Sequence, residues 1–201
     1  MTRRPIVLLA MLAACVAAIS AVVVGLAASG STPEPSGLRD TGRHDAPPTT
    51  GTGYDGAPVS VPTAGRPAIV TFLFADCPDI CPRAAQEISL ALDQAGEAAR
   101  ELDVVAVSVD PEGDTPAKVR AFLARHDLIG RMDYIVGTHA QLIPIWKAWA
   151  VAAQPAGKPV SAHSARIALV DREGRQVGAY SAGIPVRVSD LAEQMRSLVD
   201  D

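Results

Sequence analysis

The chain has 201 residues, enough for one ordinary domain and an appendage. With 48% hydrophobic and 20% charged residues, its composition is that of a globular protein that can bury a core. Its formal net charge of −4 at pH 7 gives no basic surface for nucleic acid, because phosphate binding rests on clustered lysine and arginine. We therefore expect no nucleic-acid partner.

An uncharged apolar run follows two arginines at the N-terminus. Residues 6–28 would form a helix of roughly 34 Å at about 1.5 Å per residue, enough to cross a hydrocarbon core of about 30 Å. Arg3 and Arg4 would stay on the cytoplasmic side, which places the remainder outside the cytoplasm. We predict that residues 1–28 are a single transmembrane helix that anchors the protein in the membrane.

Two other interpretations of this segment remain open. A cleaved signal peptide is one, because Leu26-Ala-Ala-Ser29 offers small residues to a peptidase. A lipoprotein signal is the other, because Leu12-Ala-Ala-Cys15 has small residues before a cysteine, although the apolar run continues for 13 residues past Cys15. All three interpretations export the rest of the chain.

The next segment differs sharply in composition. Residues 29–56 are rich in Gly, Pro, Ser and Thr and have almost no large apolar residue. Such a segment cannot bury enough surface to fold, so we predict a flexible linker, with His44 as one of its solvated residues. The folded domain is then expected at residues 57–201.

Strands and helices alternate in the predicted domain. The runs 68–74 and 103–109 are nearly continuous and β-branched, as in strands covered on both faces, and a helical apolar pattern over 82–100 joins them. The further predicted elements are a helix at 116–126, a strand at 134–136, a helix at 141–150 that Pro144 delays or kinks, hairpin strands at 165–170 and 176–180, and a helix at 189–198. This order predicts an α/β domain with a thioredoxin-like fold.

Two cysteines follow the first of these strands in the stretch FLFADCPDICP, residues 72–82. Pro82 fits the first helical position, so we expect the helix to begin there and Cys77 and Cys81 to share a tight loop at the strand's carboxyl end. The helix N-terminus should lower the pKa of Cys81 and favour its thiolate. A merely structural disulfide is the alternative, but so small a loop would add little stability.

Two thiolates are too few for a closed zinc site, which needs four ligands, but they suit Cu(I) together with an imidazole. Position favours surface roles for His126, at a helix end, and for His139, at a helix start. His163 differs, because the loop at 154–161 delivers it to the start of a strand and can fold back over the cysteines.

Three motifs carry a resemblance to a known family. The sequence CPDIC followed by Pro82, the SVDPEGDTP turn at 108–116, and the step from Ala162 through His163 into a strand are similar to the SCO/SenC family of copper-handling proteins, over residues 66–200. The resemblance implies a thioredoxin-like fold, membrane anchoring with the domain outside, and copper held by Cys77, Cys81 and His163. It also implies delivery of copper to the CuA centre of cytochrome c oxidase, whose copper-accepting subunit or a copper donor would be the partner.

Other roles stay open for these residues. If the chain is instead an enzyme, it would be a thiol-disulfide oxidoreductase that uses Cys77 and Cys81 as a redox pair to reduce the cysteines of a copper-site protein. A peroxiredoxin lacks support, because no lone cysteine has a Thr three residues before it. Asp79 could add an oxygen ligand or cap the helix.

The remaining conspicuous residues are assigned to the scaffold. We expect Asp110 with Pro111, and Asp114 with Thr115 and Pro116, to shape a turn and cap a helix, with Thr115 at the N-cap position. We expect Trp146 and Trp149 to pack in the core rather than to face a partner.

Overall fold

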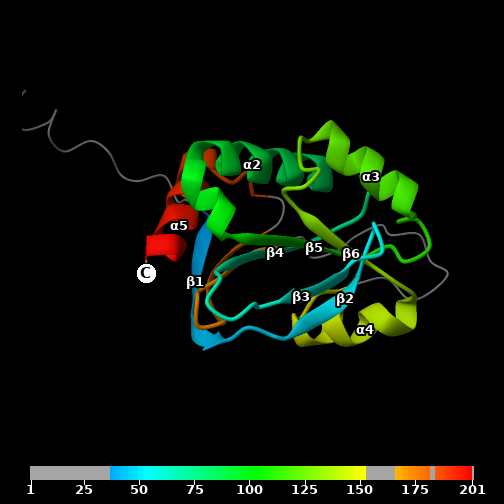
Figure 1. Ribbon diagram of the computed structural model, residues 1–201, viewed down its shortest axis with the longest axis horizontal. Helices are drawn as coiled ribbons and strands as arrows, with labels where there is room; N and C mark the ends of the chain where they lie inside the picture. Colours follow the sequence, from blue (N-terminus) through cyan, green and yellow to red (C-terminus); the bar gives the residue numbers. More distant parts are fainter. Residues whose placement is uncertain (1–36, 153–165, 182–183, 201) are drawn as a thin grey trace, which may run out of the picture. The chain divides into compact units, whose positions relative to one another are not determined.

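The computed structural model describes residues 37–152, 166–181 and 184–200, and within them eight strands form one mixed sheet (Figure 1). The strand order is β1-β8-β7-β4-β5-β6-β2-β3. The strands are β1 (Leu38–Asp45), β2 (Thr49–Gly53), β3 (Pro58–Val61), β4 (Ala68–Leu73), β5 (Asp103–Ser108), β6 (Asp133–Val136), β7 (Arg166–Val170) and β8 (Arg175–Ser181). The helices are α2 (Ile80–Ala95), the 3-10 helix η1 (Gly96–Glu101), α3 (Pro116–Arg125), α4 (His139–Ala148) and α5 (Val188–Asp200).

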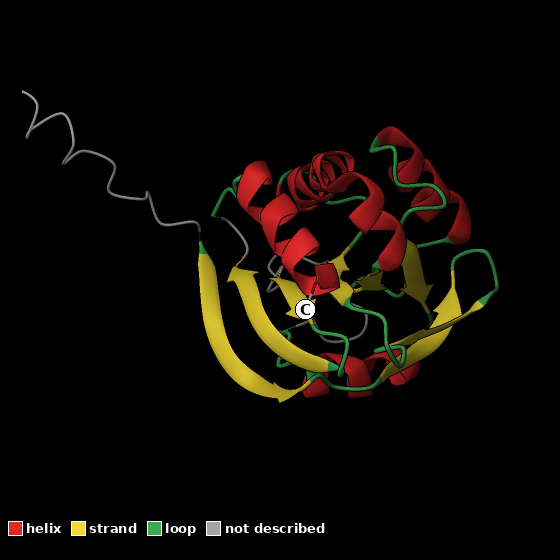
Figure 2. Cartoon of the chain, turned by 60° about the vertical axis from the view of Figure 1, so that its left-hand side comes forward, coloured by secondary structure: helices red, strands yellow, loops and turns green. Residues whose placement is uncertain are grey.

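Strand β4 lies at the centre of the sheet. It pairs in parallel with β5 and antiparallel with β7, and all six of its residues are buried. Alternate side chains face opposite layers: Thr71 points toward α2, and Phe72 contacts the Trp149 ring at the end of α4, with centroids 5.9 Å apart. Figure 2 shows α4 on one side of the sheet and the other helices on the opposite side. The apolar run at 68–74 predicts this strand correctly because both of its faces are covered.

The elements predicted from residue 68 onward are confirmed, with shifted ends. Helix α2 begins at Ile80, two residues before the predicted start, and gives way to η1 at Gly96. Helix α4 begins at His139 with Pro144 inside it, so the proline does not delay the start. Thr138 and Gln141 form a capping box that fixes the first turn of α4 instead.

The predicted linker at 29–56 differs most from the structure, because strands begin within it at Leu38. Strand β1 pairs with β8, and β2 lies between β6 and β3. The low apolar content misled the prediction, since these strands are held mainly by backbone pairing. At Gly51 a side chain would also collide with Ile135, so the absence of a large residue there is a requirement of packing.

Trp146 and Trp149 both pack in the core, as predicted. Trp146 is 4% exposed and donates from Nε1 to the Ser108 carbonyl at 2.9 Å. Trp149 is 2% exposed and donates to Thr49 Oγ1 at 2.6 Å, which ties α4 to β2. Both indoles therefore pack in the core with their polar atoms satisfied.

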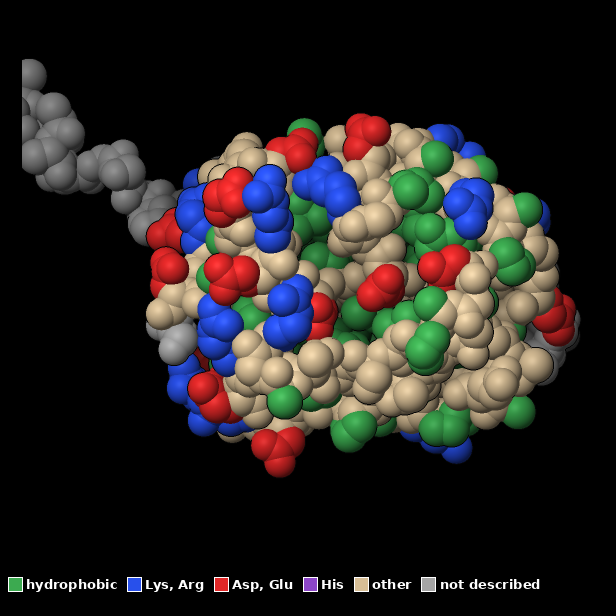
Figure 3. All heavy atoms as spheres, viewed as in Figure 1, with side chains coloured by type: hydrophobic (Ala, Val, Ile, Leu, Met, Phe, Trp, Pro, Cys, Tyr) green, Lys and Arg blue, Asp and Glu red, His purple; other side chains and the backbone are tan. Residues whose placement is uncertain are grey.

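Charges of both signs are mixed on the surface. On the face of the molecule that Figures 1 and 3 share, acidic and basic side chains lie next to one another, and no extended area carries one sign of charge (Figure 3). Over residues 37–152, 166–181 and 184–200, no helix has both the length and the hydropathy needed to cross a membrane. The predicted anchor at 1–28, including Cys15, lies outside the described residues.

Candidate metal centre

The two cysteines follow the carboxyl end of the central strand, as predicted, but only Cys77 lies in the loop, because Cys81 lies in the first turn of α2. Cys77 is 8% exposed and Cys81 is fully buried, and both are thiols. The Cys81 N–H donates to Cys77 Sγ at 3.4 Å, which places the first sulfur against the helix turn that carries the second. The two thiols are therefore close enough to bind the same small ligand or to react with each other.

Helix α2 starts before Pro82 rather than at it. Pro82 is the third helical residue, where a missing N–H costs little because the first N–H groups of a helix have no intrahelical acceptor. Cys81 consequently lies inside the first turn of the helix rather than at its N-cap.

The expected lowering of the Cys81 pKa is wrong. Burial raises the pKa of this thiol well above its ordinary value, and a hydrogen bond with the Phe74 backbone offsets the increase only in part. Desolvation of the thiolate outweighs the helix dipole here. Cys81 is thus a protonated thiol in the metal-free protein at neutral pH, and metal binding there releases a proton.

Asp79 occupies the N-cap position of α2 but makes no capping hydrogen bond with its side chain. Its carboxylate is 78% exposed and lies 3.5 Å from the Arg83 guanidinium. The predicted capping role is therefore not found. An exposed pair of this kind contributes little stability.

Sequence reasoning missed a buried hydrogen-bond network beneath the dithiol turn. Asp114 is only 5% exposed. Its Oδ1 accepts from the Ala75 N–H at 2.7 Å, and its Oδ2 accepts from Ser108 Oγ at 2.6 Å and Tyr134 Oη at 3.0 Å. Thr115 caps α3, as predicted. Ser108 ends β5 and Tyr134 lies in β6, so no local sequence pattern predicts that these side chains meet.

Asp110 has the role predicted for it. Its Oδ1 accepts from the Gly113 N–H at 3.0 Å and so shapes the turn between β5 and α3. Only the second aspartate of the DPEGD stretch reaches the cysteine-bearing turn.

Asp114 should make the folded protein less stable as the pH rises from about 4 to about 6. Burial raises its pKa from 3.8 to about 6. Between these values the folded state holds a proton that the unfolded state releases, so stability present at low pH is lost as the pH passes through the folded value. At about 1.4 kcal/mol for each pH unit, the loss totals about 3 kcal/mol.

Urea unfolding of the reduced chain at several pH values measures this loss. Asp114→Asn is the matched control, because other acids with a raised pKa, such as the half-buried Glu87, titrate alike in both chains and cancel in the difference. Identical pH profiles for the two chains would contradict the assignment.

Three of the histidines lie in the described part of the chain. His44 is exposed on β1, where its Nδ1 is 3.0 Å from the Gly42 carbonyl. His126 lies half-buried at the end of α3, its ring tilted by 59° against that of Phe122 with centroids 4.9 Å apart, and burial lowers its pKa. His139 meets the Trp146 ring edge-on at 5.4 Å. His163 lies outside the described residues.

Among the described residues, no three Cys, His, Asp or Glu side chains are grouped so as to hold a metal ion. Strand β7 begins at Arg166, and Ile167 pairs with Thr71 of β4 in antiparallel register. The start of β7 thus lies at the same edge of the sheet as the end of β4, where the cysteine turn begins.

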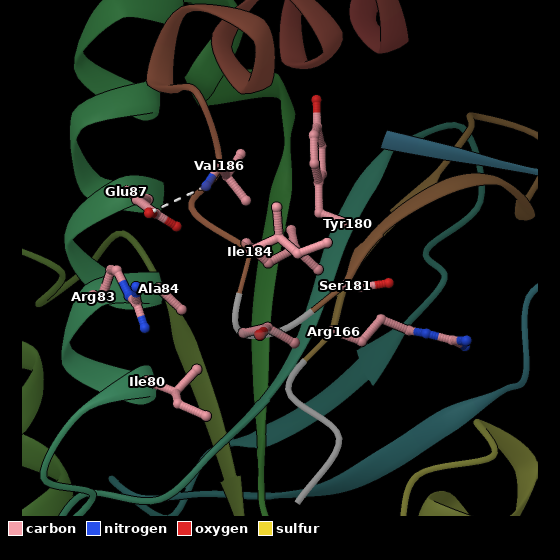
Figure 4. Close-up of a pocket in the computed structure, with 11 residues that line it drawn as sticks. Ile80, Arg83, Ala84, Glu87, Arg166, Tyr180, Ser181, Ile184 and Val186 are labelled. Atoms are coloured by element: carbon pink, nitrogen blue, oxygen red, sulfur yellow. Dashed lines mark hydrogen bonds between the residues drawn. The ribbon is translucent and has the colours of Figure 1, made fainter. Parts of the chain in front are cut away.

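A small pocket lies along α2 beside this edge (Figure 4). Ile80 and Ala84 line it from the helix, and Ile184 lines it from the segment that precedes α5. Glu87 accepts from the Val186 N–H at 3.2 Å, which ties that segment to α2, while the Tyr180 hydroxyl points away from the pocket. The pocket is a packing feature next to the cysteine-bearing helix.

The chain is similar to known proteins in both sequence and structure. A model of the SCO1/SenC family matches residues 51–200. A relative from Stutzerimonas stutzeri that is named for copper binding is 32% identical over 144 residues, 68% of each chain. The solved structure of Bradyrhizobium japonicum ScoI with copper bound is 28% identical with a TM-score of 0.63, and covers 78% of this chain and 98% of its own. Yeast Sco1 with copper bound is 25% identical with a TM-score of 0.62, and covers 76% and 88%. The mixed α/β sheet matches these solved structures.

Proposed function

The chain belongs to the SCO1/SenC family, and on that basis we propose that it is a copper-binding chaperone that carries a copper ion as its cargo. One observation carries the proposal: two thiols lie on a single turn at the end of the central strand, in a chain 28% identical to a Sco protein solved with copper bound. Two sulfur donors on one turn favour Cu(I), which prefers soft ligands and accepts a low coordination number.

We further propose that His163 completes the ligand set with Cys77 and Cys81. The direction of β7 supports this, because the strand starts at Arg166 on the edge where the cysteine turn lies, three residues after His163. None of the described histidines is grouped with the cysteines, and His126 and His139 are engaged with aromatic rings. An imidazole would satisfy the third position that two thiolates leave open.

His163→Ala is expected to weaken Cu(I) binding without abolishing it, since two sulfurs can still hold Cu(I) linearly. We expect a loss of at least roughly tenfold to a hundredfold, because removal of even an outer-shell partner of a metal ligand costs that much. Competition with a Cu(I) chelator, using the reduced full-length chain, measures the change.

His126→Ala and His139→Ala are the matched controls and should bind as the unmodified chain does. Equal losses in all three variants would mean that the histidines act through folding, and the assignment of His163 would fall.

We propose the CuA centre of cytochrome c oxidase as the destination of the copper, with the oxidase subunit that carries this centre as the partner. The family membership supports this destination. Incubation of the copper-loaded chain with the metal-free subunit should move copper to the subunit, as measured by the copper content of each protein after separation. Copper that stays on the chain would contradict this part of the proposal.

A second candidate function is thiol-disulfide exchange with the cysteines of a copper-site protein. The contact between Cys77 Sγ and the Cys81 backbone favours it, because it keeps the two thiols within one turn. The burial of Cys81 and its raised pKa weigh against Cys81 as the attacking thiolate, since only the ionised form attacks a disulfide.

We propose that the copper-binding domain lies on the extracytoplasmic side, tethered by residues 1–28. The full-length chain is then expected to remain in the membrane fraction after a carbonate wash, with its N-terminus intact, because the 6–28 run would span the bilayer. A soluble mature form that begins near Ser29 would indicate a cleaved signal, and a lipid on Cys15 would indicate a lipoprotein.

A further inference from the structure

The peptide bond between Phe74 and Ala75 connects the buried carboxylate of Asp114 to the cysteine turn. The N–H of this peptide, on Ala75, donates to Asp114 Oδ1 at 2.7 Å. The carbonyl of the same peptide, on Phe74, accepts from the Cys77 N–H at 3.3 Å. Because a trans peptide is planar and its N–H and C=O point in opposite directions, fixing the N–H also fixes the carbonyl.

Asp114 is itself held firmly by residues of two other strands. Its second carboxylate oxygen accepts hydrogen bonds from Ser108 Oγ and Tyr134 Oη, and both donors are fully buried. The carboxylate is therefore anchored to the last residue of β5 and to the start of β6, while its first oxygen accepts from the Ala75 N–H just after β4. Hydrogen bonds in series in a low-dielectric interior strengthen one another.

The peptide that Asp114 fixes holds Cys77 directly and Cys81 through Cys77. The Cys77 N–H donates to the Phe74 carbonyl, and the Cys81 N–H donates to Cys77 Sγ at 3.4 Å. Strand β4 ends at Leu73, so Phe74 and Ala75 lie beyond its backbone pairing with β5 and β7. The Ala75 N–H therefore needs an acceptor from elsewhere in the chain, and Asp114 provides it.

We propose that Asp114 is a positioning residue for the dithiol turn: through the Phe74–Ala75 peptide it sets the backbone that presents Cys77 and Cys81 to a shared ligand. Its predicted effect on copper affinity rests on the proposed function. The positioning itself does not, and it can be measured without metal.

The test uses the reduced full-length chain and two readouts. Hydrogen exchange of residues 74–81 without metal reports the order of the turn, and chelator competition reports the Cu(I) affinity. Asp114→Ala should speed exchange in this segment by roughly tenfold or more, because the Ala75 N–H loses its acceptor. It should lower the affinity by roughly tenfold to a hundredfold, as expected when a group that orients metal ligands is lost.

Two matched variants separate positioning from general destabilisation. Asp114→Asn keeps an oxygen for the Ala75 N–H and should stay close to the unmodified chain in both readouts. Tyr134→Phe removes one donor to the other oxygen, so it should cost stability while leaving exchange at 74–81 and affinity nearly unchanged. Unmodified exchange and affinity in a folded Asp114→Ala chain would overturn the proposal, and so would equal losses in the Ala and Asn variants.

If the Ala variant fails to fold, Asp114→Glu takes its place, because it keeps the charge but moves the oxygens by one methylene. We then expect faster exchange and weaker binding in the Glu variant only, and no difference between the Glu and Asn variants would overturn the proposal. If the unmodified chain binds no copper, the proposed function fails, yet the exchange readout still decides whether Asp114 orders the turn.

Discussion

A chain that begins at residue 57 is expected not to unfold cooperatively, whereas one that begins at residue 37 is expected to do so. Removal of residues 37–56 deletes β1 and β2. Strand β3 then loses its only sheet partner in the described structure, and β8 becomes an exposed edge. The Trp149 indole N–H also loses its buried acceptor, Thr49 Oγ1.

The expected loss in the free energy of unfolding exceeds the total stability of such a domain. An unsatisfied buried donor alone costs about 1–3 kcal/mol. Two deleted strands add the buried surface and hydrogen bonds of three strand pairs, against a total stability of about 5–15 kcal/mol for a typical domain. Thr49→Ala in the chain 37–201 should lose only the indole contact and fall between the two extremes.

Thermal unfolding followed by near-ultraviolet circular dichroism distinguishes the outcomes. The chain 37–201 should give one cooperative transition, and the chain 57–201 should give none. If both chains melt cooperatively within a few degrees of each other, β1 and β2 are dispensable and the segment before residue 57 behaves as the linker that its composition suggests.

The sequence predicts the centre of the fold better than its edges, for a physical reason. Strands β4 and β5 are covered on both faces, so almost every residue in them must be apolar and the pattern is plain. Strand β2, with the sequence TTGTG, is held by backbone pairing on both sides and by a glycine that leaves room for Ile135. Such a strand carries no hydrophobic signature.

The candidate site also has features that the sequence predicts and features that it does not. The place of Cys77 and Cys81 after the central strand follows from the apolar run before them, but the proline rule puts the start of α2 two residues too late. The raised pKa of Cys81 could not be predicted from local sequence. The helix dipole is worth at most about 2 kcal/mol, whereas burial can shift a pKa by up to about 3–5 units, each worth about 1.4 kcal/mol. Asp114 escapes prediction because its partners come from β5 and β6 and from the end of β4, which only the folded sheet brings together.

The redox state of Cys77 and Cys81 is expected to control copper loading almost completely. Copper binds thiolates, so a disulfide between the two cysteines removes both sulfur ligands at once. The turn can form such a bond, because Cys77 Sγ already touches the backbone N–H of Cys81. Outside the cytoplasm the oxidised form should accumulate unless a reductant acts on it.

Cys81→Ser provides the control for this prediction. It removes one sulfur, and we expect it to lower the Cu(I) affinity by more than about a hundredfold, since even changes around a metal site's ligands cost roughly tenfold to a hundredfold. The fold should persist, because serine is nearly isosteric with cysteine. Redox control should disappear together with tight binding.

A Cu(I) titration of the full-length chain against a competing chelator, in its reduced and oxidised forms, tests the central claim most directly. The reduced chain should bind about one Cu(I) tightly, the oxidised chain almost none, and reduction should restore binding without refolding. Equal loading of the two forms would show that Cys77 and Cys81 are not the primary ligands and would contradict the copper-binding function proposed for this turn.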